Sequence, residues 1–328
     1  MHDKIIYITE FGYKVSKEKE DIVITYANGT EAKYPLENIE GVYLAGEGRI
    51  SKAIMIELVE RNIDVLLLSK QSKPLIYLIP TWTKSRICKL WEKQLDINKA
   101  KKIVLARKFA LNSVKAKADV LTQLARNRKR TNVTVSNILA SYRNRIRGIE
   151  KKIKILKGDY ETLRKSFMGL EGFSARLYFE SLTYALPKNI GFKGLRTRRP
   201  PQDLFNAAIS FGYSYLKYLV DREFWLRGVN PYSGLLHEEA DKIKPFLTFD
   251  MMEGFRHWFV DKTVIGLVNT NLLKADMHIK QLKNGVHLNK SGIKLLMRKL
   301  HEEKDSKFQK QISREVSNFI NFILAEKP

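Results

Sequence analysis

The sequence has a single cysteine, no long apolar run and few acidic residues beyond its first quarter. Cys88 stands alone among 328 residues, which excludes a disulfide within the chain and a zinc site built from several thiolates. No apolar stretch approaches about 18 residues, which excludes a membrane-spanning helix. The N-terminus lacks a basic region followed by an apolar run, so we expect no secretory signal, a cytoplasmic location and no membrane partner.

Positive charge is what the sequence has in excess. The chain contains 59 Lys and Arg against 35 Asp and Glu, a formal net charge of +24. Residues 1–80 carry 10 basic and 12 acidic residues, which leaves 49 against 23 for residues 81–328. Such a surplus is typical of proteins that bind a polyanion, most often nucleic acid. A solvated basic surface that only aids solubility is the alternative.

The first 80 residues have the pattern of a small β-rich domain. Short β-branched and aromatic runs predict strands at residues 4–8, 21–26, 41–45 and 64–68. Asn28-Gly29 predicts a hairpin, because both residue types tolerate the positive φ of a tight turn. Ser51 is expected to cap a helix at residues 51–61.

From Arg86 onward the pattern is helical almost to the end. Glycine is absent between residues 86 and 145, and apolar positions such as Val114 and Val120 predict a buried stripe with basic residues on the other faces. We therefore predict an α+β protein of two domains. A small β-sandwich-like domain would span residues 1–80, a linker 81–85, and a larger all-α domain 86–328.

Three segments of the helical part carry groups suited to chemistry. Glu171 is expected at or near a helix start, where complementing the helix dipole is worth about 0.3–1 kcal/mol and is the simplest account of it. His237 follows a turn rich in glycine and proline. A lone histidine in such a place is more often a packed or capping residue than a ligand.

Asp250 and Glu253 form the third candidate group. On a helix they face the same way and repel one another, at a cost of a few tenths of a kcal/mol. Their neighbours are largely apolar, which disfavours free solvation of the pair. A bound cation would relieve the repulsion, and a bridge to Arg256 is the alternative.

Taken together, Glu171, His237 and Glu253 supply two carboxylates and an imidazole, with Asp250 as a fourth candidate group. Such ligands suit Mg²⁺ or Mn²⁺ better than a structural zinc. In a basic chain, such a metal indicates phosphodiester chemistry, with the metal activating a hydroxyl or water nucleophile. Spacing alone does not bring the three segments together.

Basic residues suited to phosphate contact gather in the same part of the chain. An arginine cluster precedes Pro200-Pro201, and Asp203 is expected to cap a helix that starts near Leu204. The candidate DNA-binding residues are Arg196, Arg198, Arg199, Arg256, Arg126, Arg128, Lys129 and Arg130.

These segments, in this order, resemble the CRISPR-associated integrase family, the catalytic subunit of spacer acquisition. The resemblance covers nearly the whole chain, and each motif is weak alone while the ordered set is specific. The matching residues are Glu171-Gly-x-x-Ala-x-x-Tyr-Phe179, Arg199-Pro-Pro-x-Asp-x-x-Asn206 with Ser210-Phe-Gly-Tyr213, Gly234-Leu-Leu-His237, and Asp250-Met-Met-Glu253-x-Phe-Arg256.

The resemblance implies a Mg²⁺ or Mn²⁺ ion held by Glu171, His237 and Glu253, with Asp250 nearby in a catalytic site. It implies a homodimer formed largely through the N-terminal domain, and a complex with a smaller partner subunit. Such a complex joins the 3′-hydroxyl ends of a short DNA duplex to a CRISPR repeat by transesterification. Members also act as metal-dependent DNA endonucleases.

Two other functions remain open on the sequence. A non-enzymatic nucleic-acid scaffold would use only the basic helices, and it has no need to keep Glu171, His237, Asp250 and Glu253 together. A transposon-encoded relative of the integrase would insert its own element, and its neighbouring genes would include no repeat array or partner gene.

Overall fold

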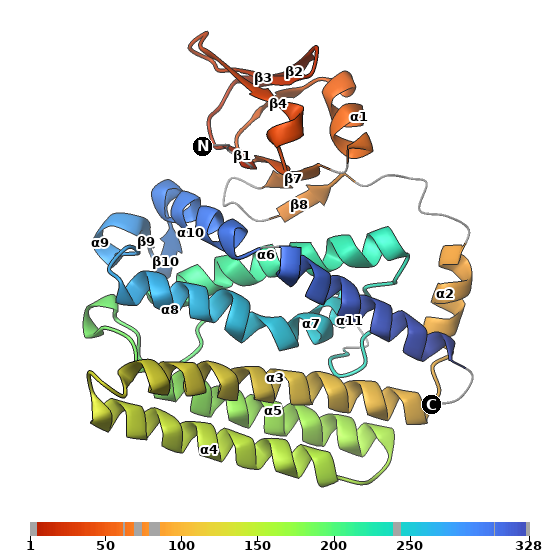
Figure 1. The fold of residues 1–328 in the computed structure, drawn as a ribbon, viewed down its shortest axis with the longest axis vertical. Coiled ribbons are helices and arrows are strands. Elements are labelled where there is room, and N and C mark those ends of the chain that lie inside the picture. The colour runs from red at the N-terminus through yellow and green to blue at the C-terminus, as the bar shows by residue number, and fades with distance from the viewer. Residues whose placement is uncertain are drawn as a thin grey trace. The chain divides into compact units, whose positions relative to one another are not determined.

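The structure, a computed structural model, describes residues 5–61, 63–68, 74–78, 86–238, 244–304 and 306–325. Contacts between Cα atoms divide the chain into two compact units, Met1–Lys84 and Ser85–Pro328 (Figure 1). The first is rich in strands and the second in helices. The predicted linker at residues 81–85 lies outside the described residues.

The first unit contains two four-stranded sheets. One has the order β4-β3-β2-β6, from the strands Glu31–Pro35, Asp21–Thr25, Tyr13–Glu18 and Gly48–Ile50. The other has the order β1-β5-β7-β8, from Ile5–Ile8, Gly41–Leu44, Asp64–Leu68 and Pro74–Tyr77. The predicted hairpin is confirmed: β3 and β4 pair antiparallel, and Gly29 has a φ of +83° in the connection.

Both sheets of the first unit share one apolar core. The core cluster includes Ile8 of β1, Val15 of β2 and Ile24 of β3, together with Leu58 of helix α1 (Lys52–Glu60). Ser51 caps α1, as predicted, and its side chain accepts a hydrogen bond from the backbone N–H of Ile54 at 3.4 Å. The unit is therefore a sandwich-like β structure with one helix built into its core.

Helices make up most of the second unit, whose long elements begin at asparagine or aspartate caps. Asx side chains accept a backbone N–H in the first turn of five of them, which satisfies a donor that the helix itself leaves free. The capped helices are α3 (Lys99–Arg128), α4 (Val133–Ile155), α5 (Tyr160–Leu182), α6 (Leu204–Arg227) and α10 (Lys290–Glu303). Asp203 caps α6, as predicted.

The remaining elements complete this unit. They are α2 (Arg86–Leu95), α7 (Phe246–Phe255), a π-helical turn (Arg256–Asp261), α8 (Lys262–Asn269), α9 (Ala275–His278), α11 (Ser306–Leu324) and the strands β9 (Ile279–Leu282) and β10 (Gly285–Leu288). Two short 3₁₀ turns, Leu36–Asn38 in the first unit and Lys188–Ile190 in the second, complete the described elements. The α+β class with a β-rich N-terminal part is confirmed. The antiparallel β9–β10 hairpin is an addition to the expected all-α domain.

Packing around α3 places the site. Helix α3 runs alongside α4 and α5 and also contacts α7 and the π-helical turn (Figure 1). Helix α3 therefore brings residues of α5 and α7, which are far apart in the sequence, close to its own side chains. Among the described residues, no helix combines the length and the apolar character that crossing a membrane requires.

Candidate active site

Glu171 lies in the middle of a helix. Helix α5 begins at Tyr160, after the cap Asp159, and continues to Leu182, so the expectation of a helix start near Glu171 is wrong. The glycines on either side of it, Gly169 and Gly172, are tolerated within the helix. Dipole complementation at a helix N-terminus therefore does not explain Glu171, because that effect fades within the first turn.

Glu171 and Glu253 meet at Ser113 of α3. The Ser113 hydroxyl lies 2.8 Å from Glu171 Oε1 and 3.3 Å from Glu253 Oε2. A hydroxyl has one proton to donate, so it can serve only one of the two carboxylates at a time. Two acids that lie 82 positions apart in sequence thus contact the same hydroxyl group. Helices α5 and α7, which carry them, converge at Ser113.

Each of these two carboxylates has its own cation. Lys117 of α3 donates from Nζ to Glu171 Oε1 at 2.5 Å, and Arg256 forms an ion pair with Glu253. Burial raises the pKa of Glu171, but the charge and hydrogen bond of Lys117, with the Ser113 hydroxyl, outweigh it and lower this pKa to about 2. Glu171 is therefore ionised at neutral pH.

Asp250 is fully buried, with 0% of its surface exposed. Its Oδ2 accepts the backbone N–H groups of Leu235 and Leu236, both at 2.8 Å. Its Oδ1 accepts the backbone N–H of His237 at 3.0 Å and lies 2.7 Å from the ring Nδ1. Both carboxylate oxygens are thus committed to the 235–237 segment, and Asp250 acts on the site by positioning His237.

His237 is oriented by a contact at one of its two ring nitrogens, Nδ1. A carboxylate only accepts hydrogen bonds, so the Nδ1 that faces Asp250 carries a proton, and in the neutral ring Nε2 carries the lone pair. Burial lowers the pKa of His237, while Asp250, Glu253 and Glu171 together raise it above its ordinary value. Both glutamates act on this ring through their charge. Asp250, which holds the ring, lies on the same helix as Glu253, α7.

The loop that carries His237 has a further support in Tyr160. Its hydroxyl donates to the backbone carbonyl of Leu235 at 2.7 Å, and burial raises the pKa of Tyr160 to about 12. Ser113, Lys117 and Tyr160 are the residues of the site that the sequence did not indicate. The expectation that basic residues of this region face outward is wrong for Lys117 and Lys101, which are both buried.

The donor set fits a hard divalent cation. Two carboxylates and an imidazole whose second nitrogen is held by an aspartate are the groups that Mg²⁺ and Mn²⁺ sites use, with the aspartate fixing the ring. In the described part of the chain, however, no three acidic, histidine or cysteine side chains are already grouped closely enough to hold a metal ion. Instead, Lys117 forms an ion pair with Glu171 and Arg256 forms one with Glu253.

A second polar cluster is in contact with Arg256. The guanidinium carbons of Arg196 and Arg256 lie 5.5 and 5.3 Å from the ring centroid of Tyr213. The Tyr213 hydroxyl donates to Asp261 at 2.6 Å, and the other oxygen of Asp261 holds His257 at 2.8 Å. Arg256 thereby connects this cluster to the acid pair.

The candidate DNA-binding residues are not equivalent in the structure. Arg198 and Arg199 are exposed, as are Arg126, Lys129 and Arg130 at the end of α3. Arg196 instead binds Asn206 at 3.0 Å and Ser210 at 2.9 Å within the protein, and Arg128 donates to the carbonyl of Ala185 at 3.2 Å.

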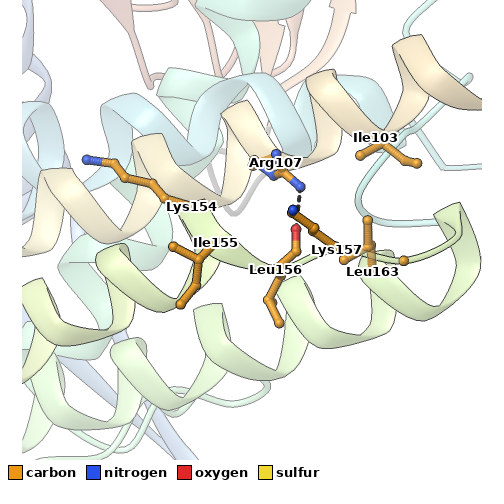
Figure 2. A pocket seen from close by; sticks show the side chains of 8 residues that line it. Ile103, Arg107, Lys154, Ile155, Leu156, Lys157 and Leu163 are labelled. Carbon is orange, nitrogen blue, oxygen red and sulfur yellow. Dashed lines mark hydrogen bonds between the residues drawn. The ribbon is translucent and has the colours of Figure 1, made fainter.

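The cavity in Figure 2 is separate from the acid cluster. It has a volume of about 410 Å³ and is lined by Ile103, Arg107, Lys154, Ile155, Leu156, Lys157, Gly158 and Leu163, where α4 gives way to α5. Arg107 donates to the carbonyl of Leu156 at 2.7 Å, across this space. None of the four predicted site residues lines it.

Comparison with known proteins places the chain in a family. The model of the family described as CRISPR associated protein Cas1 matches residues 6–302. A CRISPR-associated endonuclease Cas1 of Archaeoglobus fulgidus is 26% identical over 318 residues, 93% of this chain and 89% of that protein.

Two solved structures share the fold. A casposase bound to integration product has a TM-score of 0.78 at 20% identity, over 99% of this chain and 92% of that one. A Cas6-RT-Cas1–Cas2 complex has a TM-score of 0.75 at 20% identity, over 98% of this chain and 35% of that one. With a family model matched over nearly its whole length, the chain belongs to the CRISPR-associated Cas1 family.

Proposed function

We propose that the protein is a divalent-metal-dependent DNA integrase and endonuclease, which inserts short DNA into a CRISPR repeat array. One observation carries this proposal. The imidazole of His237 is fixed through Nδ1 by the buried Asp250, which shares helix α7 with Glu253, and Glu253 meets Glu171 at Ser113. A protein that only bound nucleic acid as a scaffold would not need these groups together, because burying acidic side chains lowers stability.

The reaction is a transesterification. The oxygen of an incoming 3′-hydroxyl forms a bond to phosphorus while the bond to the leaving 3′-oxygen of the repeat breaks, so the number of phosphodiester bonds is unchanged. With water as nucleophile, the same displacement is hydrolysis, the endonuclease reaction. When bound, Mg²⁺ or Mn²⁺ supplies Lewis-acid stabilisation of the phosphate and activation of the nucleophile.

The chain's own residues have distinct tasks in this proposal. Glu171, His237 and Glu253 bind the metal, and Asp250 keeps the His237 proton on Nδ1 so that Nε2 can act as a ligand. In this proposal Arg256, which pairs with Glu253, and the exposed Arg198 and Arg199 contact phosphate. Arg126, Lys129 and Arg130 extend the basic surface along α3.

The partners follow from the charge distribution and the relatives. The net +26 after residue 80 supports double-stranded DNA as the partner of the helical unit. The first unit, Met1–Lys84, has a net charge of only −1 and can pair with its own copy without strong repulsion, which supports a homodimer. The Cas1–Cas2 complex among the structural neighbours supports assembly with a smaller partner subunit in the cytoplasm.

A strand-transfer assay tests the proposal. A duplex with 3′-hydroxyl ends and a plasmid bearing the repeat are incubated with the protein, the partner subunit and Mn²⁺ or Mg²⁺. His237→Ala is expected to lower the rate about 10²-fold or more, because loss of a ligand removes several kcal/mol of transition-state stabilisation.

His278→Ala is the matched control, because this histidine lies on α9 and its Nδ1 only accepts the backbone N–H of Lys274 at 3.0 Å. It is expected to retain the wild-type rate. Full activity of His237→Ala, or equal activity with and without chelator, would contradict the proposed site.

A further inference from the structure

Lys117 is an unusual lysine, because it is completely buried. Its relative exposure is 0%, and its ammonium lies among polar groups of the acid cluster. Nζ donates to Ser113 Oγ at 2.8 Å and to Glu171 Oε1 at 2.5 Å. A buried ammonium is costly to desolvate, so a lysine stays in such a place only when specific acceptors compensate the loss of water.

The two hydrogen bonds to Glu171 both end on the same carboxylate oxygen. Oε1 accepts from Lys117 and from Ser113, while the side chain keeps 15% of its surface exposed. Oε2 is therefore the oxygen that remains for a ligand outside these contacts. Across the cluster, Arg256 pairs with Glu253 in a similar way. Each of the two acids thus already has a positive partner before any ion arrives.

This arrangement offsets most of the negative charge of the cluster without a metal. The acids at 171 and 253 are matched by the cations at 117 and 256, and Asp250 is matched by backbone N–H groups and the His237 ring. An incoming divalent cation meets carboxylates whose charge is partly neutralised, and it meets an ammonium of the same sign. The Lys117 ammonium and the divalent cation repel each other, and this Coulomb repulsion is strong where water is excluded.

On the basis of the proposed function, we propose that Lys117 is a positioning residue that takes the place of a metal ion at Glu171. It holds the carboxylate oriented in the metal-free protein, and by competing for the same charge it weakens the binding of the divalent cation. The cluster can therefore fold without metal, and its affinity for metal is set by a residue that is not itself a ligand.

Mn²⁺ affinity of the full chain tests this role directly. Free Mn²⁺ is followed by its EPR signal during titration of the wild type and of Lys117→Met, which is one atom shorter, keeps the unbranched shape of the side chain and removes the charge. The variant is expected to bind Mn²⁺ about tenfold more tightly, because a neighbouring like charge is lost. Its metal-free melting temperature is expected to fall, and the Mn²⁺-induced rise in melting temperature to exceed that of the wild type.

Three further variants separate charge from shape. Lys117→Arg keeps the charge and should stay near the wild-type affinity, while Lys117→Gln keeps an N–H donor and should bind more tightly. Lys101→Met is the matched control: this buried lysine on the same helix donates to the carbonyl of Ala325, away from the acids. It should lower stability without changing the affinity for Mn²⁺.

The outcomes distinguish this inference from the function on which it rests. If the wild type binds Mn²⁺ and neither neutral variant at position 117 binds it more tightly, the competing role of Lys117 is overturned and the proposed metal site stands. If Lys117→Met does not fold, Lys117→Gln decides. If the wild type and both neutral variants fail to bind Mn²⁺, the metal site is overturned, and this inference with it.

Discussion

The two units of the chain differ in what they bury. The described core of the first unit is apolar, and Asp64 is the charged residue of that unit that is buried among the described residues. The second buries Lys117, Asp250, Glu253 and Asp261 among its apolar residues. Buried charges contribute little to stability compared with apolar packing, so their concentration in one unit marks where function constrains the sequence. The surplus of positive charge and the candidate site residues belong to the helical unit, whereas the charges of the β-rich unit nearly cancel.

The largest expected effect comes from damage to the apolar core of the first unit. Leu58→Ala in α1 removes a fully buried side chain and should lower the free energy of unfolding of this unit by about 2–5 kcal/mol. If the units are as different as their cores indicate, the Mn²⁺ affinity of the folded variant stays unchanged. Thermal unfolding and Mn²⁺ titration check the two effects, with Ile56→Ala, on the exposed face of the same helix, as the control.

A change to a single buried acid of the second unit should act on chemistry. Asp250→Asn keeps the shape but replaces an accepting oxygen by an NH₂ group, which faces donors of the 235–237 segment. Strand transfer should fall about 10- to 100-fold, the usual effect of losing the group that orients a metal ligand. Asp276→Asn, at an exposed position of α9, should leave the rate unchanged. Equal rates for the two variants would contradict the role of Asp250.

The salt dependence of DNA binding tests the contrast in charge between the two units. Each phosphate contact contributes about 0.9 to the slope of log K against log salt for duplex DNA. Replacement of Arg198 and Arg199 by alanine should therefore reduce this slope by about 1.8 if both contact phosphate. Arg49→Ala, at an exposed position of the first unit, should not change it. Fluorescence anisotropy at several salt concentrations gives the slope, and an unchanged slope for the double variant would remove these arginines from the interface.

The smallest effect concerns the support of the His237 loop. Tyr160→Phe loses the bond to the Leu235 carbonyl and should lower stability by about 1 kcal/mol. Because burial raises the pKa of Tyr160 from 10.0 to about 12, the folded state binds this proton more tightly than the unfolded state. The resulting stability is present below pH 10 and is lost as the pH rises through about 12. Ultraviolet titration of tyrosinate, wild type minus Tyr160→Phe, should show one group titrating near pH 12.

The sequence was informative where the relevant forces are local. The Asn28-Gly29 hairpin and the caps Ser51 and Asp203 depend on a few neighbouring residues, and the structure confirms them. The β2 and β6 strands were not predicted, because Tyr13–Glu18 contains charged residues and Gly48–Ile50 is only three residues long.

The site was only partly predictable. Glu171, His237, Asp250 and Glu253 were found through ordered motifs, but the helix around Glu171 was expected to start too late, because its cap at Asp159 lies three turns earlier. Ser113 and Lys117 could not be found in this way. They reach Glu171 from another helix, across more than 50 residues, and a buried lysine runs against the expectation that basic residues face solvent.

The proposed site requires that His237 bind a metal through Nε2 while Asp250 holds Nδ1. Pulsed EPR of Mn²⁺ bound to the full chain tests it most directly, because a nitrogen ligand produces a ¹⁴N modulation of the signal. We expect one bound Mn²⁺ with nitrogen coupling in the wild type, and loss of that coupling in His237→Ala. Bound Mn²⁺ without nitrogen coupling, or coupling that persists in His237→Ala, would contradict the account.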